Sequence, residues 1–151
     1  MFKKFLLITF FIISSYANTL KIGDTLPAFT LPDQFDKKHT IDTQKYTTFI
    51  ISFEKDISAM VNEFLKKQPD NFLETNKTVY ISDIHKMPSF VTSWFAVPKM
   101  KKYNYTLMLM YEENPIFPQH EEAVTVIKFQ DDKIYSIDFI KEENNLQSIF
   151  H

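Results

Sequence analysis

Two groups of side chains that bind metals or transfer protons follow two apolar segments of the sequence. They are Glu54, Lys55 and Asp56 after residues 47–53, and Asp83, His85 and Met87 after residues 78–81. Carboxylates and imidazoles bind divalent cations and exchange protons near neutral pH. The sequence therefore predicts a binding rim of Glu54, Lys55, Asp56, Asp83 and His85, with Asp56, Asp83, His85 and Met87 as metal ligands. The alternative is that Asp56 caps a helix and the others are solvated loop residues.

A copper site is a second reading of the same residues. His85 and Met87 form an H-x-M pair, and imidazole and thioether ligands suit Cu(I). Three further methionines do not add to this pair, because Met60 falls on the apolar face of a predicted helix and Met108 and Met110 fall in an apolar strand. Filling gaps in a core is the ordinary use of such methionines.

The elements that would position the rim are strands that alternate with helices. Residues 47–53 form an apolar, β-branched run, typical of a strand covered on both faces. An amphipathic helix follows from near Asp56 to before Pro69, with its apolar positions at Ile57, Met60, Val61, Phe64 and Leu65. The strand of residues 78–81 comes next. Such β-α-β order predicts parallel strands whose carboxyl ends share one edge of the sheet.

The rest of the chain predicts a mixed sheet. A second helix is expected over residues 88–97, burying Phe90, Val91, Trp94 and Phe95 and ending at Pro98, followed by a strand over residues 105–111. Residues 124–129 and 133–140 flank the tight connection 130–132, which indicates an antiparallel hairpin. A short C-terminal helix carries Leu146, Ile149 and Phe150, and residues 18–45 are turn-rich with short edge strands.

The first seventeen residues have the pattern of a signal peptide. Two lysines precede an apolar run, and small residues at Ser15 and Ala17 match the positions that a signal peptidase reads. We expect cleavage between Ala17 and Asn18 and a mature domain of residues 18–151. A retained membrane anchor is the alternative, although the apolar run is shorter than the roughly 20 residues that span a bilayer. The interpretation places the protein in the periplasm of a Gram-negative bacterium.

Composition excludes several classes of function. The chain has 151 residues, a formal charge of −2, one glycine and no cysteine, and all of its basic residues are lysines. Without arginine and with an acidic balance, nucleic-acid binding is not expected. A single glycine excludes a glycine-rich nucleotide loop. Without cysteine the chain cannot perform thiol chemistry.

The opening segment IGDTLPAFTLPDQFDKKHTI resembles that of peroxiredoxin and redoxin domains in the thioredoxin-like superfamily. The matching positions are Gly23, Pro27, Phe29, Leu31, Asp33 and Gln34. The resemblance implies a thioredoxin-like three-layer α/β/α sandwich with a mixed central sheet. Residues from KTVYISDIHKMP to AVTVIKFQDDKIYSI are also similar to exported, cysteine-poor YtfJ-type proteins of Gram-negative bacteria.

The departures from this superfamily limit what the resemblance implies. Where its members place the nucleophilic cysteine, this chain reads Glu54–Ser58, and no proline precedes Val124, where thioredoxins keep a cis-proline. Thiol peroxidase and disulfide exchange are therefore excluded, and the copper proteins of this fold also rely on two cysteines. We expect a non-enzymatic binding or assembly module for an envelope protein, without a cofactor. The alternative is a divalent-metal or copper carrier, or a thiol-independent enzyme, using Glu54, Asp56, Asp83 and His85.

One modification site is also predicted. Residues 74–78, ETNKT, match the extended acidic sequon that some bacteria glycosylate in the periplasm, with Asn76 as the acceptor.

Overall fold

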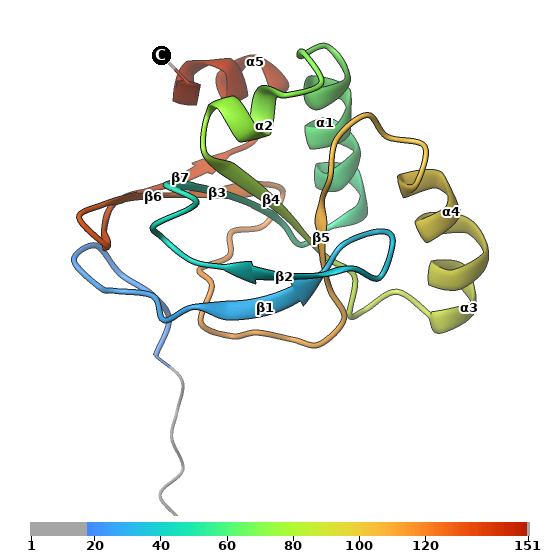
Figure 1. Ribbon diagram of the computed structural model, residues 1–151, viewed down its shortest axis with the longest axis horizontal. Helices are drawn as coiled ribbons and strands as arrows, with labels where there is room; N and C mark the ends of the chain where they lie inside the picture. The colour runs from blue at the N-terminus through green and yellow to red at the C-terminus, as the bar shows by residue number, and fades with distance from the viewer. Residues whose placement is uncertain (1–17, 151) are drawn as a thin grey trace, which may run out of the picture.

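A five-stranded mixed sheet forms the centre of the protein in the computed structural model, which describes residues 18–150 (Figure 1). The predicted signal peptide and Ala17 lie outside the described residues. The strand order is β5-β4-β3-β6-β7. The strands are β3 (Thr48–Ser52), β4 (Thr78–Asp83), β5 (Met108–Met110), β6 (Val124–Gln130) and β7 (Lys133–Ile140).

The first three of these strands run parallel, and the last two form an antiparallel hairpin. β3 pairs in parallel with β4, and β4 with β5, whereas β6 runs antiparallel to both β3 and β7. The carboxyl ends of β3, β4 and β5 therefore lie at the same edge of the sheet, as predicted. The hairpin prediction is also confirmed: its turn uses Asp131 and Asp132, both with positive φ, which matches the twist of the strands it joins.

The central strands are apolar because both of their faces are covered. Every residue of β3 and β4 is buried. Ile50 faces one hydrophobic cluster, and its neighbours Phe49 and Ile51 face the other. Alternation of side chains across a pleated strand, with apolar layers on both sides, removes the polar positions that a half-exposed strand would show.

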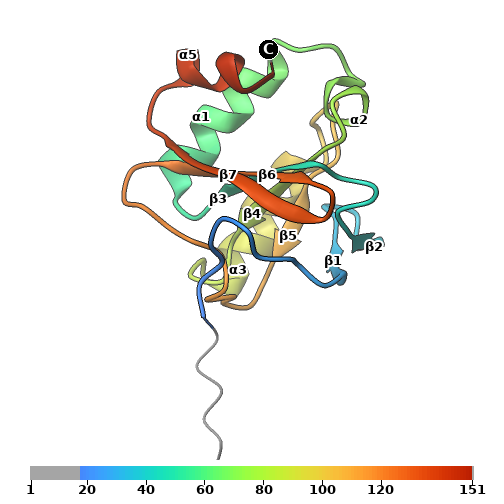
Figure 2. The same cartoon turned by 90° about the vertical axis from the view of Figure 1, so that its left-hand side faces the viewer.

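Helices cover one face of the sheet. Its cluster is built by α1 (Lys55–Lys66), α2 (Phe72–Thr75), α5 (Glu143–Leu146) and the end of the helix of residues 89–100. Figure 2 shows α1, α2 and α5 on the same side of the sheet. The predicted apolar face of α1 is confirmed, with Ile57, Val61, Phe64 and Leu65 buried. The predicted C-terminal helix is also present as α5 and a following 3-10 turn, Gln147–Phe150, whereas α2 was not predicted.

A hairpin and a loop cover the opposite face. β1 (Phe29–Pro32) and β2 (Lys38–Ile41) pair antiparallel and lie below the sheet in Figure 1. Ile41 and Phe117, from the segment after β5, are among the buried residues of this second cluster. The three layers are thus helices, a mixed sheet, and a layer built from the hairpin and the 111–123 segment.

The helix between β4 and β5 differs from its prediction. It runs continuously from α3 (Ser89–Val91) through a π-helical turn (Thr92–Ala96) into α4 (Val97–Met100). The expectation that Pro98 ends the helix is wrong, because proline stands in the first turn of α4, where its missing N–H is tolerated. We call the whole element helix 89–100.

The buried face of helix 89–100 was also predicted wrongly. Phe90, Trp94 and Phe95 are 59%, 73% and 64% exposed, whereas Thr92 and Met100 are buried. The segment is apolar nearly all round, so its periodicity does not select a face, and the π-turn shifts the register further. In the described part of the chain, no helix combines the length and apolar character needed to cross a bilayer.

Candidate functional site

The rim begins where β3 passes into α1. Glu54 is the N-cap residue of α1, so Asp56 lies in the first turn and the prediction of an Asp56 cap is wrong. The Glu54 side chain does not cap its own helix. Its Oε1 accepts a hydrogen bond from the backbone N–H of Glu122, at 3.0 Å. Because Glu122 stands two residues before β6, this bond joins the start of α1 to the loop that faces it.

The loop before β6 has an unusual backbone at Glu122, with a φ of 56°. A positive φ is strained for a residue with a side chain, and the hydrogen bond to Glu54 holds the Glu122 amide in that conformation. Ala123 occupies the position before Val124, and the described residues contain no cis peptide bond. The loop therefore lacks the backbone feature that the resemblance would place there.

Asp83 and His85 form the second part of the rim. Asp83 Oδ1 accepts hydrogen bonds from His85 Nδ1, at 2.6 Å, and from the His85 backbone N–H, at 3.0 Å. The Asp83 side chain is only 2% exposed, while that of His85 is 20% exposed. The carboxylate therefore closes the turn that leaves β4 and fixes the orientation of the imidazole.

The metal ligands predicted from the sequence are only partly brought together. Among residues 18–150, no three His, Asp or Glu side chains come close enough to hold a metal ion, so Asp56 does not join the Asp83–His85 pair in such a group. Met87 is half-buried and packs against the helical-side cluster. Lys55 and Asp56 are exposed on the first turn of α1. A metal role would need ligands beyond Asp83 and His85.

A buried cluster of hydroxyl groups lies between the first turns of α1 and the sheet. Ser52 Oγ is 2.8 Å from Ser58 Oγ and 3.0 Å from Tyr80 Oη, and Ser58 Oγ is 3.4 Å from Ser82 Oγ. Ser52 on β3 and Ser82 on β4 are direct partners in the parallel register, and both are buried. We call these four residues the hydroxyl cluster.

The hydroxyl cluster holds its tyrosine in the neutral form and pairs its serines with other hydroxyls. Burial raises the pKa of Tyr80 to about 12, although hydrogen bonds from the three serines act in the other direction. Tyr80 is thus a neutral phenol at physiological pH. The hydrogen-bond partners of these serine side chains are hydroxyls, and none is an imidazole or a carboxylate. A serine without a general base is a poor nucleophile, so the cluster does not replace the missing thiol with a serine mechanism.

Polar contacts continue beneath α1 towards the loop before β5. Tyr105 donates to Asn62 Oδ1, at 2.5 Å, and the Asn62 amide donates to Tyr103 Oη, at 3.2 Å. Burial raises the pKa values of both tyrosines. These bonds satisfy the polar groups under the helix, which fixes α1 against the loop rather than preparing a reactive group.

Sequence reasoning missed the hydroxyl cluster, although a signal was present. Serine ends β3 at Ser52 and stands at the equivalent position of β4 at Ser82, and each serine follows a run of apolar residues. Small polar residues at matched positions of parallel neighbours indicate a shared polar contact on one face. Only the contact of Ser58 on α1 with these two serines could not be predicted without the tertiary structure.

The motif residues of the opening segment have structural roles. Buried Gln34 donates from Nε2 to the Tyr105 carbonyl, at 2.9 Å, and accepts the Leu107 N–H at Oε1, at 3.1 Å. Asp33 Oδ1 accepts the N–H groups of Phe35 and Lys37, and Oδ2 contacts His39 Nε2 at 2.7 Å. Burial raises the pKa of Asp33, but these hydrogen bonds outweigh it and the net pKa is lowered.

Asn76, the predicted glycosylation site, is the C-cap residue of α2. Its side-chain amide is half-buried and donates to the Phe72 carbonyl at 2.8 Å. Thr78 of the sequon is buried in β4 and donates to the Asn76 carbonyl. The amide nitrogen to which a glycan would attach is thus engaged in the cap, and modification stays a prediction.

Two surface cavities lie away from the rim. One of about 460 Å³ is lined by residues such as His39, Lys45 and Asn104, and one of about 360 Å³ by residues such as Lys128 and Asn145. Neither includes a rim residue. The charged residues of the rim are therefore separate from both hollows.

Comparison with known proteins identifies the fold. No family model matches the sequence, and no curated protein matches it. The thioredoxin domain of a thiol-disulfide oxidoreductase from Bacteroides vulgatus superposes with a TM-score of 0.55 at 12% identity, over 88% of this chain and 100% of that one. BsSco, a member of the Sco family of cytochrome c oxidase assembly proteins, gives 0.51 at 13% identity, over 87% and 94%.

A third similar structure is a SCO1/SenC family lipoprotein from Bacillus anthracis, with a TM-score of 0.50 at 12% identity, over 83% of this chain and 92% of that one. Identities this low establish a shared fold and no more. The superpositions extend over 83–88% of this chain, so they cover most of its mixed sheet and helices. The protein therefore has the thioredoxin-like fold and contains no cysteine.

Proposed function

We propose that this protein is a periplasmic, non-enzymatic binding or assembly module that holds an envelope protein at the rim. The observation that carries the proposal is the hydroxyl cluster, which fills the space between α1 and the sheet with mutually bonded groups and no base. A scaffold whose reactive position is filled in this way retains a surface for contact but no group for covalent catalysis.

The shape and charge of the rim fit a protein partner. Glu54, Lys55 and Asp56 are exposed side by side, and neither cavity extends beneath them. Small-molecule sites are concave and mostly apolar, whereas the solvent-accessible margins of protein–protein interfaces are polar. A similar structure belongs to a family named for assembly of cytochrome c oxidase, and another is a lipoprotein, which supports an envelope role for this chain.

Export is part of the same proposal. The leader pattern of residues 1–17 supports it, and mass spectrometry of the protein isolated from its host tests it. A mature N-terminus at Asn18 is expected. An N-terminus at residue 1 in a cytosolic fraction would contradict it.

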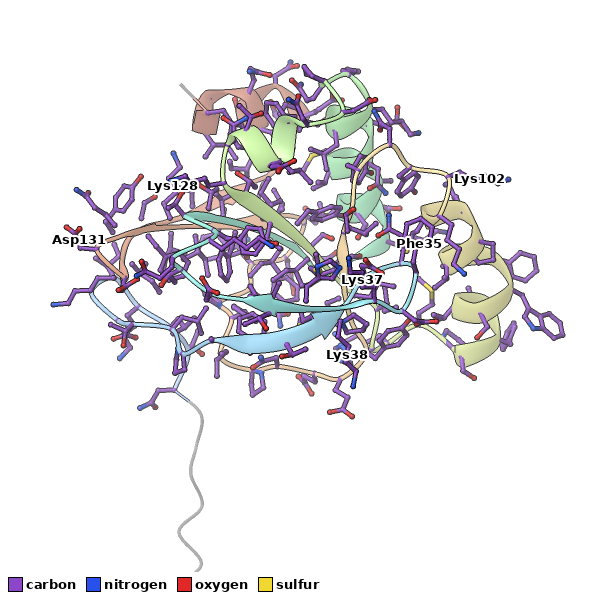
Figure 3. All side chains as sticks on the ribbon, in the orientation of Figure 1. Phe35, Lys37, Lys38, Lys102, Lys128 and Asp131 are labelled. Atoms are coloured by element: carbon purple, nitrogen blue, oxygen red, sulfur yellow. The ribbon has the colours of Figure 1, made fainter. Side chains whose placement is uncertain are left out.

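Site-specific photocrosslinking tests the partner. A benzophenone amino acid that replaces Lys55 places the probe on the rim. The same amino acid in place of Asp131 places the probe on the β6–β7 turn, at the left edge of the molecule in Figure 3. We expect one discrete protein adduct from position 55 in living cells and none of that mass from position 131. Equal adducts from both positions, or none from position 55, would refute the proposal.

A further inference from the structure

We propose that helix 89–100 docks this protein onto an anionic lipid surface. Three large aromatic side chains of this helix, Phe90, Trp94 and Phe95, are more than half exposed. Residues 88–98 contain no charged residue. An exposed aromatic group of this size on one element of a small protein marks an interaction surface. This surface is separate from the rim and does not depend on the function proposed for the rim.

The aromatic side chains are not unfilled core positions. Thr92 and Met100 are buried, and Ala96 and Val97 pack against the helical-side cluster, so the inner face of the helix is complete without them. Thr92 Oγ1 donates to the Pro88 carbonyl, which ties the start of the π-turn to the preceding loop. The helix is therefore fixed to the domain while it presents its aromatic side chains outward.

Lysines lie at the carboxyl end of this helix and on the hairpin loop that meets it. Lys99, Lys101 and Lys102 are exposed at the carboxyl end of the helix. The hairpin loop adds Lys37 and Lys38, together with exposed Phe35. Gln34 Nε2 brings that loop to the end of the helix through its bonds to the carbonyls of Met100 and Tyr105. Figure 3 shows Lys102 and Phe35 towards the side of the molecule that carries α4, with Lys37 and Lys38 nearer its middle.

The combination of aromatic residues and lysines indicates that a lipid surface binds this face. Tryptophan and phenylalanine partition into the boundary between headgroups and acyl chains, and lysines beside them are attracted to anionic headgroups. The protein as a whole carries a formal charge of −2, whereas this region gathers five lysines. The hairpin loop has two acids: Asp36 is exposed, and Asp33 is buried and paired with His39. A contact of this kind lies on the membrane and does not span it.

Two other occupants fit less well. A second copy docked through the same face would place lysines against lysines, because a two-fold contact brings identical patches together. A small apolar ligand needs a hollow, and neither cavity includes Phe90, Trp94 or Phe95. An acidic protein segment shares the charge of the lipid surface, and the experiment below separates the two.

Trp94 is the only tryptophan in the chain, so its fluorescence reports on this face alone. The purified protein is titrated with vesicles of phosphatidylcholine, with and without phosphatidylglycerol, at low salt. We expect a blue shift of Trp94 emission and quenching by brominated acyl chains with the anionic vesicles only. A leader that remained attached would bind vesicles but would not make Trp94 depend on the lysines of the helix.

Two variants test the lysines and the aromatic side chains. K99Q/K101Q/K102Q is expected to weaken the vesicle interaction about a hundredfold, at about fivefold for each lysine. The control K21Q/K133Q/K141Q removes the same charge elsewhere and is expected to bind as the wild type. F90S/F95S keeps the reporter and is expected to abolish the shift, whereas Y135S/F139S, which alters exposed aromatic residues of β7, is not.

Four results would overturn the proposal: no shift with anionic vesicles, an equal shift with neutral vesicles, equal binding by the two lysine triples, or a shift that grows with protein concentration in the absence of lipid. A shift produced by soluble polyglutamate but not by vesicles would also overturn it and would assign the face to an acidic protein. Circular dichroism melting curves verify that the variants remain folded.

Discussion

The rim and helix 89–100 lie on the same domain but differ in how their side chains are used. At the rim, Glu54, Asp83 and the hydroxyl cluster make hydrogen bonds within the protein. On the helix, Phe90, Trp94 and Phe95 leave their apolar surface in solvent. The polar groups at the rim are thus paired within the protein, whereas the aromatic side chains of helix 89–100 have no packing partner in the domain.

This difference concerns what each set of side chains contributes to the fold. Buried polar groups such as those of the hydroxyl cluster must be paired, because an unpaired buried hydroxyl costs about 1–3 kcal/mol. Exposed aromatic residues bring no such penalty and contribute little to folding. Their presence on helix 89–100 is therefore better explained by an external contact than by stability.

The largest effect is expected from the residue that joins the hairpin loop to the end of helix 89–100. Gln34→Ala leaves the Tyr105 carbonyl and the Leu107 N–H buried and unpaired, which should lower the free energy of unfolding by about 3 kcal/mol. Urea denaturation measures this. Gln119→Ala, at an exposed position, is the control and should change stability by less than about 0.5 kcal/mol. Equal losses would mean that Gln34 does not anchor the loop.

The comparison becomes direct when one thiol is introduced in each region. Ser58→Cys places it in the hydroxyl cluster and Ser93→Cys on the exposed side of helix 89–100, and no native cysteine interferes. We expect the Cys introduced at position 58 to react with Ellman's reagent at least about tenfold more slowly than the Cys introduced at position 93. The reason is that the side chain at position 58 is packed against Ser52 and Ser82. Faster reaction at position 58 would show that the rim is open and activates a nucleophile.

The acid dependence of stability tests the hairpin that carries Phe35, Lys37 and Lys38. The pKa of Asp33 is lowered in the folded protein, so its contribution is fully present above the unfolded value of about 3.9 and is lost as the pH falls towards the folded pKa. Between pH 5 and pH 3 the wild type should lose stability that Asp33→Asn does not lose, because only the wild type has the carboxylate whose pKa is lowered on folding. Asp131→Asn, on an exposed turn, should follow the wild-type profile in the same urea titrations.

The smallest effect is expected from removing the predicted metal ligands. In elemental analysis of the purified protein, Asp56→Ala/His85→Ala should have the same metal content as the wild type and as His120→Ala, an exposed histidine control. The reason is that Asp56 does not join the Asp83–His85 pair. Stoichiometric metal that disappears only in the double variant would favour the metal-carrier alternative over a binding module.

Most of the fold could be predicted because its signals are local. The apolar run before Glu54 and the periodic helix after it gave β3 and α1, and two apolar strands around a three-residue connection gave the β6–β7 hairpin. The prediction for helix 89–100 failed because a segment that is apolar on nearly every side has no preferred face. It also failed because Pro98 stands in the first turn of α4, where a proline does not end the helix. At the candidate site, the Asp83–His85 pair was predictable from its spacing, but the bond from Glu54 to Glu122 was not, since it joins residues 68 apart.

By itself the sequence determined the chemistry that is absent, because a chain without cysteine has no thiolate in any conformation. It also determined the alternation of strands and helices, since hydrophobic periodicity follows from which faces are buried. Only the tertiary structure decided that Ser52, Ser58, Tyr80 and Ser82 meet and that Trp94 and its neighbours face solvent. The meeting of the hydroxyl groups and the exposure of the aromatic side chains both depend on how segments far apart in the sequence pack together. Local sequence patterns carry no information about that packing.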